Sequence, residues 1–368
     1  MGAGTAQGGA CLLISGKVRK NMEFVVFAGV LLLLFIFMIV QELIQTKNQE
    51  KLFKKYLREN YGKEPPKEYS LERFARLGSY LERHKEEKQL DDITWNDLGM
   101  DEVFRRIDRT YSAAGEEYLY YTLRNISCGR EALEHLEEVV NWLQEQENIK
   151  VRIQLLMKRL GHLGKYSLYD YLDNLDYLGE RSNRKIVLGN LLYLPFLLLL
   201  FVQPAMGTIG IVLCMLWHIM TYFREKKVIE PYIISFAYVL RLIDVCEELE
   251  KQKIPVYRRE LDELREALKS LRELRRGAYW VMAGNQGKIG GNPLDILADY
   301  LRMILHLDIF QFNRMLEKLR KKTGQVENML AITGYLDMAI SVGGFRKSLE
   351  GYCIPKLEED TEKAFLHM

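Results

Sequence analysis

Few residues in this sequence stand at the spacings that catalysis, metal binding or phosphate binding requires. The nearest match to a phosphate-binding loop runs from Gly284 to Lys288, but it has too few residues between its glycines and has Ile289 where a metal-binding hydroxyl belongs. This stretch is therefore interpreted as a flexible loop. The five cysteines include no CxxC pair, the six histidines never stand at metal-ligand spacing, and no nucleophile-elbow, kinase or dinucleotide motif occurs. The sequence predicts no catalytic residue, no cofactor-binding residue and no metal site, and hence no enzyme activity for this chain.

Charged side chains offer a weaker indication of phosphate binding. Acidic pairs such as Glu116-Glu117 and Glu137-Glu138 are expected on solvated helix faces. One basic cluster lies away from the apolar segments and has the charge to contact DNA phosphates, although it lacks the interleaved aromatic residues on which bases stack. The members of this cluster, our candidate phosphate or DNA contacts, are Arg314, Lys318, Arg320, Lys321 and Lys322.

Composition alone describes the chain poorly. Its 368 residues carry 52 Lys and Arg against 50 Asp and Glu, a net charge of +2, which argues against a general nucleic-acid-coating protein. However, the 18 residues between Glu23 and Glu42 and the 38 residues between Lys185 and Arg224 carry no charge. The averages of an ordinary soluble protein therefore conceal two apolar segments.

The first apolar segment, residues 24–40, would measure about 25 Å as a helix, which is enough to cross the hydrocarbon core of a membrane. A secretory signal peptide is the alternative, but no small-residue cleavage site follows, so we predict an uncleaved anchor. Met22 stands just before the apolar run and follows a Gly- and Ala-rich stretch. We hypothesise that translation begins there.

The second apolar segment, residues 186–223, would measure about 57 Å as one helix, nearly twice the thickness of the hydrocarbon core. It is therefore predicted to fold back into two short spans, residues 186–202 and 208–223, with Gln203, Pro204 and Gly207 in the turn. A hairpin buried in a soluble core is the alternative, but its helices would show a polar face, and these show none.

Basic residues on both sides of the hairpin place its two flanks in the cytoplasm by the positive-inside rule, whereas its loop carries no charge. We expect a multi-pass membrane protein with both main helical regions cytoplasmic. A transporter would place ionisable groups along its pathway, but His218 alone lies within the spans, so we interpret the spans as anchors. The flanking residues are Arg181, Arg184 and Lys185 before the hairpin and Arg224, Lys226 and Lys227 after it.

The remaining sequence is predicted to be helical, with no alternating run long enough for a sheet. Apolar stripes at helical spacing occur from Arg130 onward, in residues 258–276 and in the helix expected before them. Ile254-Pro255 separates the last two, which we expect to form an antiparallel pair of long helices. Ser70, Ser112 and Ser167 are expected helix caps. The stripes consist of Leu133, Leu136, Val140 and Leu143, of Phe236, Leu240 and Ile243, and of Leu261, Leu264, Leu268 and Leu271.

Two blocks of this sequence resemble the central core domain of MutS-type mismatch repair proteins. The first, DDITWNDLGMDEVFRRIDRTYSAAGEEYLYYTLRN, has Val103-Phe104 in a helix, then Thr110 in a turn, Gly115, and the Leu-rich stretch 119–123. The family's Arg after the glycine is Glu116 here, and its Trp-Leu-Pro ending is Thr-Leu-Arg, so this block is diverged. The second, MLAITGYLDMAISVGGFRKSLEGYCIPKL, is similar to the helix by which the core returns, and its matching residues are Gly334, Leu336, Asp337, Ser341, Tyr352 and Pro355.

The resemblance covers roughly residues 91–357 and implies an all-α, membrane-anchored helical bundle with long lever-like helices and three transmembrane helices. In MutS-type proteins the core and lever transmit the ATP state to a clamp that holds DNA. The hairpin either replaces that clamp or is inserted earlier in the core. No counterpart of the mismatch-reading domain is found, and the C-terminal ATPase domain, to which ATP and Mg would belong by resemblance, is expected to be missing.

The resemblance thus implies a membrane-anchored MutS-related protein of the DNA mismatch repair class, holding only the core or connector region. The alternative is a non-enzymatic membrane scaffold that binds a protein partner through its cytoplasmic helices. The expected partners are a lipid membrane, DNA, and a protein partner or a second copy of the chain. The predicted organisation is an N-terminal tail (1–23), a transmembrane helix (24–40), a basic helix and linker (41–90), the first part of the core (91–185), the transmembrane hairpin (186–223), lever-like helices (224–292), the second part of the core (293–357) and a C-terminal tail (358–368).

Overall fold

The computed structural model describes residues 36–41, 43–63, 69, 71–85, 88–126, 129–163, 167–275 and 293–353. The chain divides into two units, residues 1–59 and 60–368. In the first unit, residues 36–41 and 43–59 are helical, as expected for a helix that continues beyond the first apolar segment. Most of that predicted span, residues 24–35, lies outside the described residues, as does Ser70.

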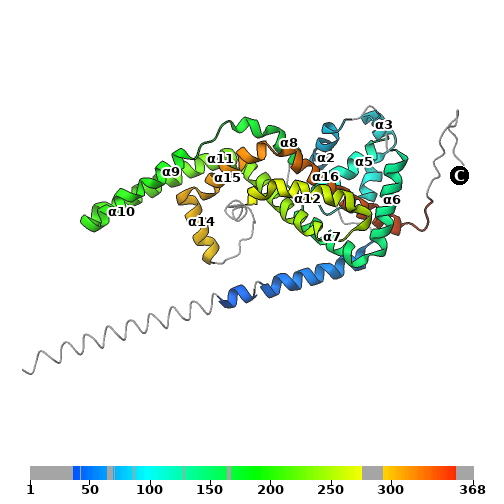
Figure 1. The fold of residues 1–368 in the computed structure, drawn as a ribbon, viewed down its shortest axis with the longest axis horizontal. Helices are drawn as coiled ribbons and strands as arrows, with labels where there is room; N and C mark the ends of the chain where they lie inside the picture. The colour runs from blue at the N-terminus through cyan, green and yellow to red at the C-terminus, as the bar shows by residue number, and fades with distance from the viewer. Residues whose placement is uncertain are drawn as a thin grey trace, which may run out of the picture. The chain divides into compact units, whose positions relative to one another are not determined.

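The second unit confirms the all-α class (Figure 1). Within the described part of the chain, the only β-type pairing is an isolated bridge between Gln89 and Asn125. The helices are α2 (Leu71–Arg83), α3 (Asp92–Asp97), α4 (Met100–Ile107), α5 (Ala113–Arg124), α6 (Arg130–Glu145), α7 (Glu147–Leu160), α8 (Leu168–Asp173), η1 (Asn174–Leu178), α9 (Arg184–Leu191), α10 (Tyr193–Val202), α11 (Pro204–Glu250), η2 (Pro255–Tyr257), α12 (Arg258–Leu271), η3 (Arg272–Arg275), α14 (Pro293–Leu305), α15 (Leu307–Arg320) and α16 (Thr323–Ser348).

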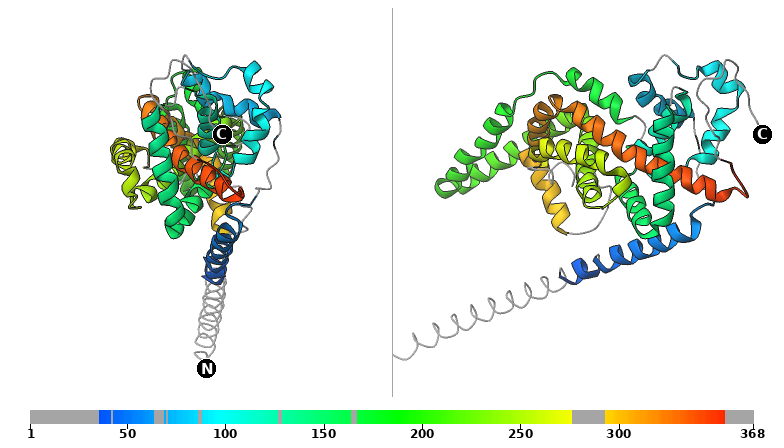
Figure 2. Two further views of the ribbon diagram at one scale, coloured as in Figure 1. Left: turned by 90° about the vertical axis from the view of Figure 1, so that its right-hand side faces the viewer. Right: turned by 45° about the vertical axis from the view of Figure 1, so that its right-hand side comes forward.

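Helix α16 is the centre of the main core. It packs against α5, α6, α7, α11 and α12, and Figure 2 shows it running between these helices. Its buried residues lie on all sides of the helix, from Val326 to Gly344, and many are small, which lets several neighbours approach its backbone. The core around it includes Phe236, Tyr257 and Phe312 from three other helices.

Helix α11 joins the apolar hairpin to this core. Its 47 residues continue through Pro231 and span about 70 Å at the usual helical rise. The N-terminal half pairs with α10, while the C-terminal half is buried against α7, α12, α15 and α16. Figure 1 shows α9, α10 and the start of α11 extending away from the other helices of this unit.

The predicted stripes of α11 and α12 are buried, including Phe236, Leu240 and Leu264. Pro255 opens η2 at the expected break, and α12 then turns back, so that Arg265 pairs with Glu250 at 2.8 Å. The two helices differ in length, since α11 has 47 residues and α12 has 14. In α6 the stripe is buried at Val140 and Leu143 but not at Leu133, which is exposed.

Candidate functional site

The two segments predicted to resemble the MutS core pack on each other through α5 and α16. A glycine on each helix makes the approach possible. A Cβ atom added at Gly334 would lie 2.5 Å from the carbonyl oxygen of Ala114, and one added at Gly115 would collide with the carboxylate of Asp337. The two helices therefore cross with backbone close to backbone, and neither position tolerates a side chain.

Asp337 ties the beginning of α5 to the middle of α16. Its fully buried carboxylate accepts hydrogen bonds from Ser112 N at 2.8 Å, Ser112 Oγ at 2.6 Å and Tyr111 N at 3.0 Å. Ser112 also caps α5 as predicted, because its Oγ accepts a hydrogen bond from Gly115 N at 3.1 Å. A carboxylate beside a helix N-terminus is favoured by the unpaired N–H groups and the helix dipole there.

Ser341 makes a second connection one helical turn further along α16. Its hydroxyl donates to Ile107 O and accepts from Arg109 N, both at 2.7 Å. Between these residues, Asp108 accepts hydrogen bonds from the backbone and side chain of Thr110 at 3.0 and 2.5 Å. The link between α4 and α5 is therefore fastened to α16 by residues that both blocks of the resemblance contribute.

The acidic pair at the start of α5 is buried, so the prediction of a solvated face is wrong for these two residues. The carboxylate of Glu116 is contacted by Arg73, by Arg76 at 2.8 Å and by His162 at 3.2 Å. The carboxylate of Glu117 accepts a hydrogen bond from Ser167 Oγ at 2.9 Å. Sequence reasoning missed this cluster because the partners of the pair lie on α2 and in the segment that joins α7 to α8, far from α5 in sequence.

Burial raises the pKa of Glu117 to about 8, although the hydrogen bond from Ser167 and the charge of Arg76 partly oppose this. Each carboxylate in the junction has named donors, and among the described residues no group of three or more His, Cys, Asp and Glu side chains could hold a metal ion. The α5–α16 junction is held together by buried hydrogen bonds and ion pairs.

The hairpin is the second candidate site. Two helices, Arg184–Val202 and Pro204–Glu250, are long and apolar enough to cross a membrane. The first is divided into α9 and α10 because Pro195 has no N–H to donate to the carbonyl of Leu191. Gln203 forms the turn as predicted, whereas Pro204 and Gly207, also predicted to lie in the turn, belong to α11, which begins at Pro204.

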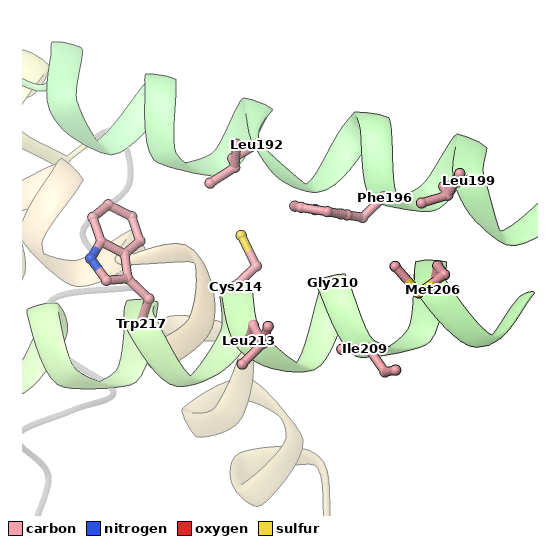
Figure 3. A pocket seen from close by; sticks show the side chains of 9 residues that line it. All are labelled: Leu192, Phe196, Leu199, Met206, Ile209, Gly210, Leu213, Cys214 and Trp217. Atoms are coloured by element: carbon pink, nitrogen blue, oxygen red, sulfur yellow. The ribbon is translucent and has the colours of Figure 1, made fainter. Parts of the chain in front are cut away.

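Glycines let the two arms of the hairpin pack closely, as Figure 3 shows for the part around Gly210. A Cβ atom at Gly207 would lie 2.7 Å from Leu200 N, and one at Gly210 would collide with the ring of Phe196. The faces turned away from this contact are exposed and apolar. Only 6% of the apolar window in Arg184–Val202 is buried, which is unlike a hairpin in a soluble core.

His218, the ionisable residue of the spans, lies at the base of the hairpin. Its Nδ1 is 2.9 Å from Cys214 O, and its ring packs against Tyr193 and against His306, the residue directly before α15. Burial and the neighbouring His218 lower the pKa of His306 to about 4, so His306 is neutral near pH 7. The single histidine of the spans is thus enclosed by protein.

The structure does not present the five candidate phosphate contacts as one open surface. Three of them have partners within the chain. Lys318 pairs with Glu273 at 2.9 Å, Arg320 donates to Leu175 O at 2.7 Å, and Lys322 donates to Ser270 O. The other two, Arg314 and Lys321, are exposed.

No protein-family model, no curated protein and no solved structure matches this chain. The resemblance to MutS-type cores therefore stays a prediction, and the geometry of the junction and the hairpin carries the functional argument.

Proposed function

We propose that this chain is a membrane-anchored connector of MutS-core type, in which a lipid-embedded hairpin stands where MutS-type proteins carry the DNA clamp. The observation that carries the proposal is the continuity of α11. One helix belongs to the apolar hairpin at its N-terminal end and to the helical core at its C-terminal end. The position of the hairpin in a bilayer would therefore set the position of the core.

The chemistry of the hairpin suits a bilayer. Phe201, Val202 and Met220 expose 89%, 78% and 73% of their surface, and transfer of such side chains from water into lipid is worth about 1.5–3 kcal/mol each. Two backbone donors at the turn are paired within the chain, since Gln203 N donates to Leu199 O and Gly207 N donates to Gln203 O. Lipid cannot supply hydrogen-bond partners, so pairing of donors beside the turn within the protein suits a hairpin in a bilayer.

A short path connects α11 to the α5–α16 junction. The carbonyl oxygen of Gly161, just after α7, accepts hydrogen bonds from Tyr238 Oη at 3.4 Å and from Ala113 N at 3.0 Å. Tyr238 belongs to α11, and Ala113 is the first residue of α5. A tilt or rotation of α11 would thus be transmitted to the start of α5, which supports a connector rather than a passive anchor.

Topology labelling tests the membrane part of this proposal. In the full chain with its native cysteines replaced, a cysteine at Gln203 should react with a membrane-impermeant maleimide only from outside, and one at Ser182 only from the cytoplasmic side. The protein should also stay with membranes in alkaline carbonate. Release by carbonate, or labelling of the Gln203 position from the cytoplasm, would contradict a spanning hairpin.

DNA is the partner that the resemblance suggests, and a protein partner is the alternative. The alternative is favoured by the engagement of Lys318, Arg320 and Lys322 within the chain. Fluorescence anisotropy of labelled DNA duplexes, titrated with the full chain in detergent, distinguishes DNA from a protein as the partner. MutS-type binding predicts an affinity that falls steeply between about 50 and 200 mM salt.

The double variant R314A/K321A should weaken that binding, whereas R152A/R258A, which removes the same charge from exposed positions elsewhere, should not. Absence of DNA binding at the lowest salt would contradict DNA as a partner and favour the protein-binding scaffold. Its protein partner would then be sought by crosslinking in the membrane.

A further inference from the structure

A charged cavity of about 450 Å³ lies at the base of the hairpin. Both flanks of the hairpin and the corner between α14 and α15 contribute to its lining. The basic residues that line it are Arg181, Lys185 and Arg224, and the acidic ones are Glu180 and Glu225. Its formal charge is therefore +1 when both histidines of the lining, His218 and His306, are counted as neutral.

The charges of this cavity are not equally available. Arg181 is held by Glu225 Oε2 at 2.5 Å and by Asn313 Oδ1 at 3.1 Å, so this pair is neutralised within the protein. Lys185 and Arg224 line the cavity and are exposed. They come from opposite flanks of the hairpin, one on α9 and one on α11, so an anion between them would bridge the two arms.

An apolar groove of about 390 Å³ begins where the charged cavity ends. It runs between α10 and α11, and Figure 3 shows Phe196, Leu213 and the other side chains that line it. Trp217 lines both the groove and the charged cavity. A tryptophan at this boundary is typical of the level where lipid headgroups meet acyl chains.

We propose that the base of the hairpin binds one anionic phospholipid, with its phosphate between Lys185 and Arg224 and an acyl chain in the groove beyond Trp217. The proposal rests on the membrane insertion argued above and adds a ligand to it. A charged cavity that continues into an apolar groove fits an amphipathic ligand better than a free phosphate, and basic pockets between membrane helices on the cytoplasmic side suit acidic headgroups.

General attraction of basic flanks to anionic lipid is the explanation to be separated from a specific site. The chain offers a matched control for this purpose. Arg184 and Lys227 are exposed, lie within three residues of Lys185 and Arg224 respectively, and do not line the cavity. The variants K185Q/R224Q and R184Q/K227Q therefore remove the same charge at the same level of the hairpin.

The test uses the full chain in a neutral detergent, with the melting temperature measured against added phosphatidylglycerol, phosphatidylcholine or soluble glycerol 3-phosphate. We expect phosphatidylglycerol to raise the melting temperature more than phosphatidylcholine, and glycerol 3-phosphate to have little effect. K185Q/R224Q should lose most of the difference between the two lipids, and R184Q/K227Q should keep it. E180Q, which removes a negative charge from the lining, should enlarge it.

Three results would overturn the site. Equal stabilisation of the wild type by both lipids would show no headgroup preference, equal loss in the two double variants would show general attraction, and a full response to glycerol 3-phosphate would show a soluble ligand. Retention of every variant in carbonate-washed membranes distinguishes failure of the lipid site from failure of membrane insertion. The melting temperature in phosphatidylcholine checks that each variant is folded.

Discussion

Asp337 and Ser112 are separated by 225 residues in the sequence and joined by two hydrogen bonds, at 2.8 Å to the backbone nitrogen and 2.6 Å to the hydroxyl. The pair holds the N-terminus of α5 against the middle of the central helix. The carboxylate of Asp337 is fully buried, so these donors replace the water that it loses on folding. Removal of either residue leaves buried polar atoms without hydrogen-bond partners, which lowers the stability of the fold.

Removal of the carboxylate should therefore destabilise the core. We expect D337A to lower the free energy of unfolding by about 2–4 kcal/mol and S112A by about 1–2 kcal/mol. The double variant should cost less than the sum, since the two residues share their interaction. Chemical unfolding in detergent measures these values, with D97N at an exposed position of α3 as the control. Strict additivity would contradict the pairing.

The crossing of α5 and α16 predicts an unusual response to alanine. Replacement of glycine by alanine inside a helix normally stabilises it by about 1 kcal/mol, because alanine loses less backbone entropy. G78A in α2, where a Cβ atom meets nothing within 4 Å, should behave in this way. G115A and G334A should instead lower the melting temperature, since their Cβ atoms collide with Asp337 and Ala114. Stabilisation by either would show that the helices are further apart.

The raised pKa of Glu117 predicts that the free energy of unfolding decreases as the pH rises. Its pKa is about 8 in the folded protein against 4.5 for the free side chain, so between these values the folded state binds more protons than the unfolded state. Stability should then fall by about 1.4 kcal/mol per pH unit as the pH rises towards 8.

The sign is opposite for His306, whose lowered pKa makes stability rise with pH between about pH 4 and 6.5. The effect of Glu117 is therefore best measured between pH 6.5 and 8, where His306 contributes little. E117Q should remove most of the slope of the melting temperature in that window, and an unchanged slope would mean that Glu117 is ionised in the folded state.

Close packing of the hairpin arms predicts that a larger residue on one arm destabilises the hairpin and that a smaller residue on the other arm partly restores it. G210A should lower the melting temperature in detergent, because its Cβ atom meets the ring of Phe196. The double variant F196A/G210A should recover part of the loss, since the smaller residue makes room. V212A, which shortens an exposed side chain two positions away that does not line the groove, serves as the control. A G210A loss that F196A deepens would argue against this contact.

Several features of the fold follow from local sequence and are confirmed. The apolar stripe of α12 and the caps at Ser112 and Ser167 depend on residues within one or two helical turns. The turn at Gln203 follows from the length of an uncharged segment and the position of Pro204. Pro195 also indicates the division between α9 and α10, where the predicted span 186–202 is one continuous helix.

Partners that come from distant segments could not be predicted in this way. Glu116 and Glu117 have the spacing of a solvated face, and their burial depends on Arg73, Arg76 and Ser167. The sequence likewise does not reveal that Lys318 pairs with Glu273 on η3 or that Arg320 donates to Leu175 O on η1. Which charges face water is decided when helices pack, because packing supplies both the burial and the counter-charge.

By itself, the sequence determined that this protein is helical and that it carries a hairpin apolar enough for a membrane, because periodicity and hydrophobic length are properties of consecutive residues. Only the tertiary structure decided that α11 runs unbroken from the hairpin into the core. It also brought Asp337 to Ser112 and placed Lys185 and Arg224 around one cavity. Each of these depends on where helices meet in space, and that is set by the summed packing of the whole core.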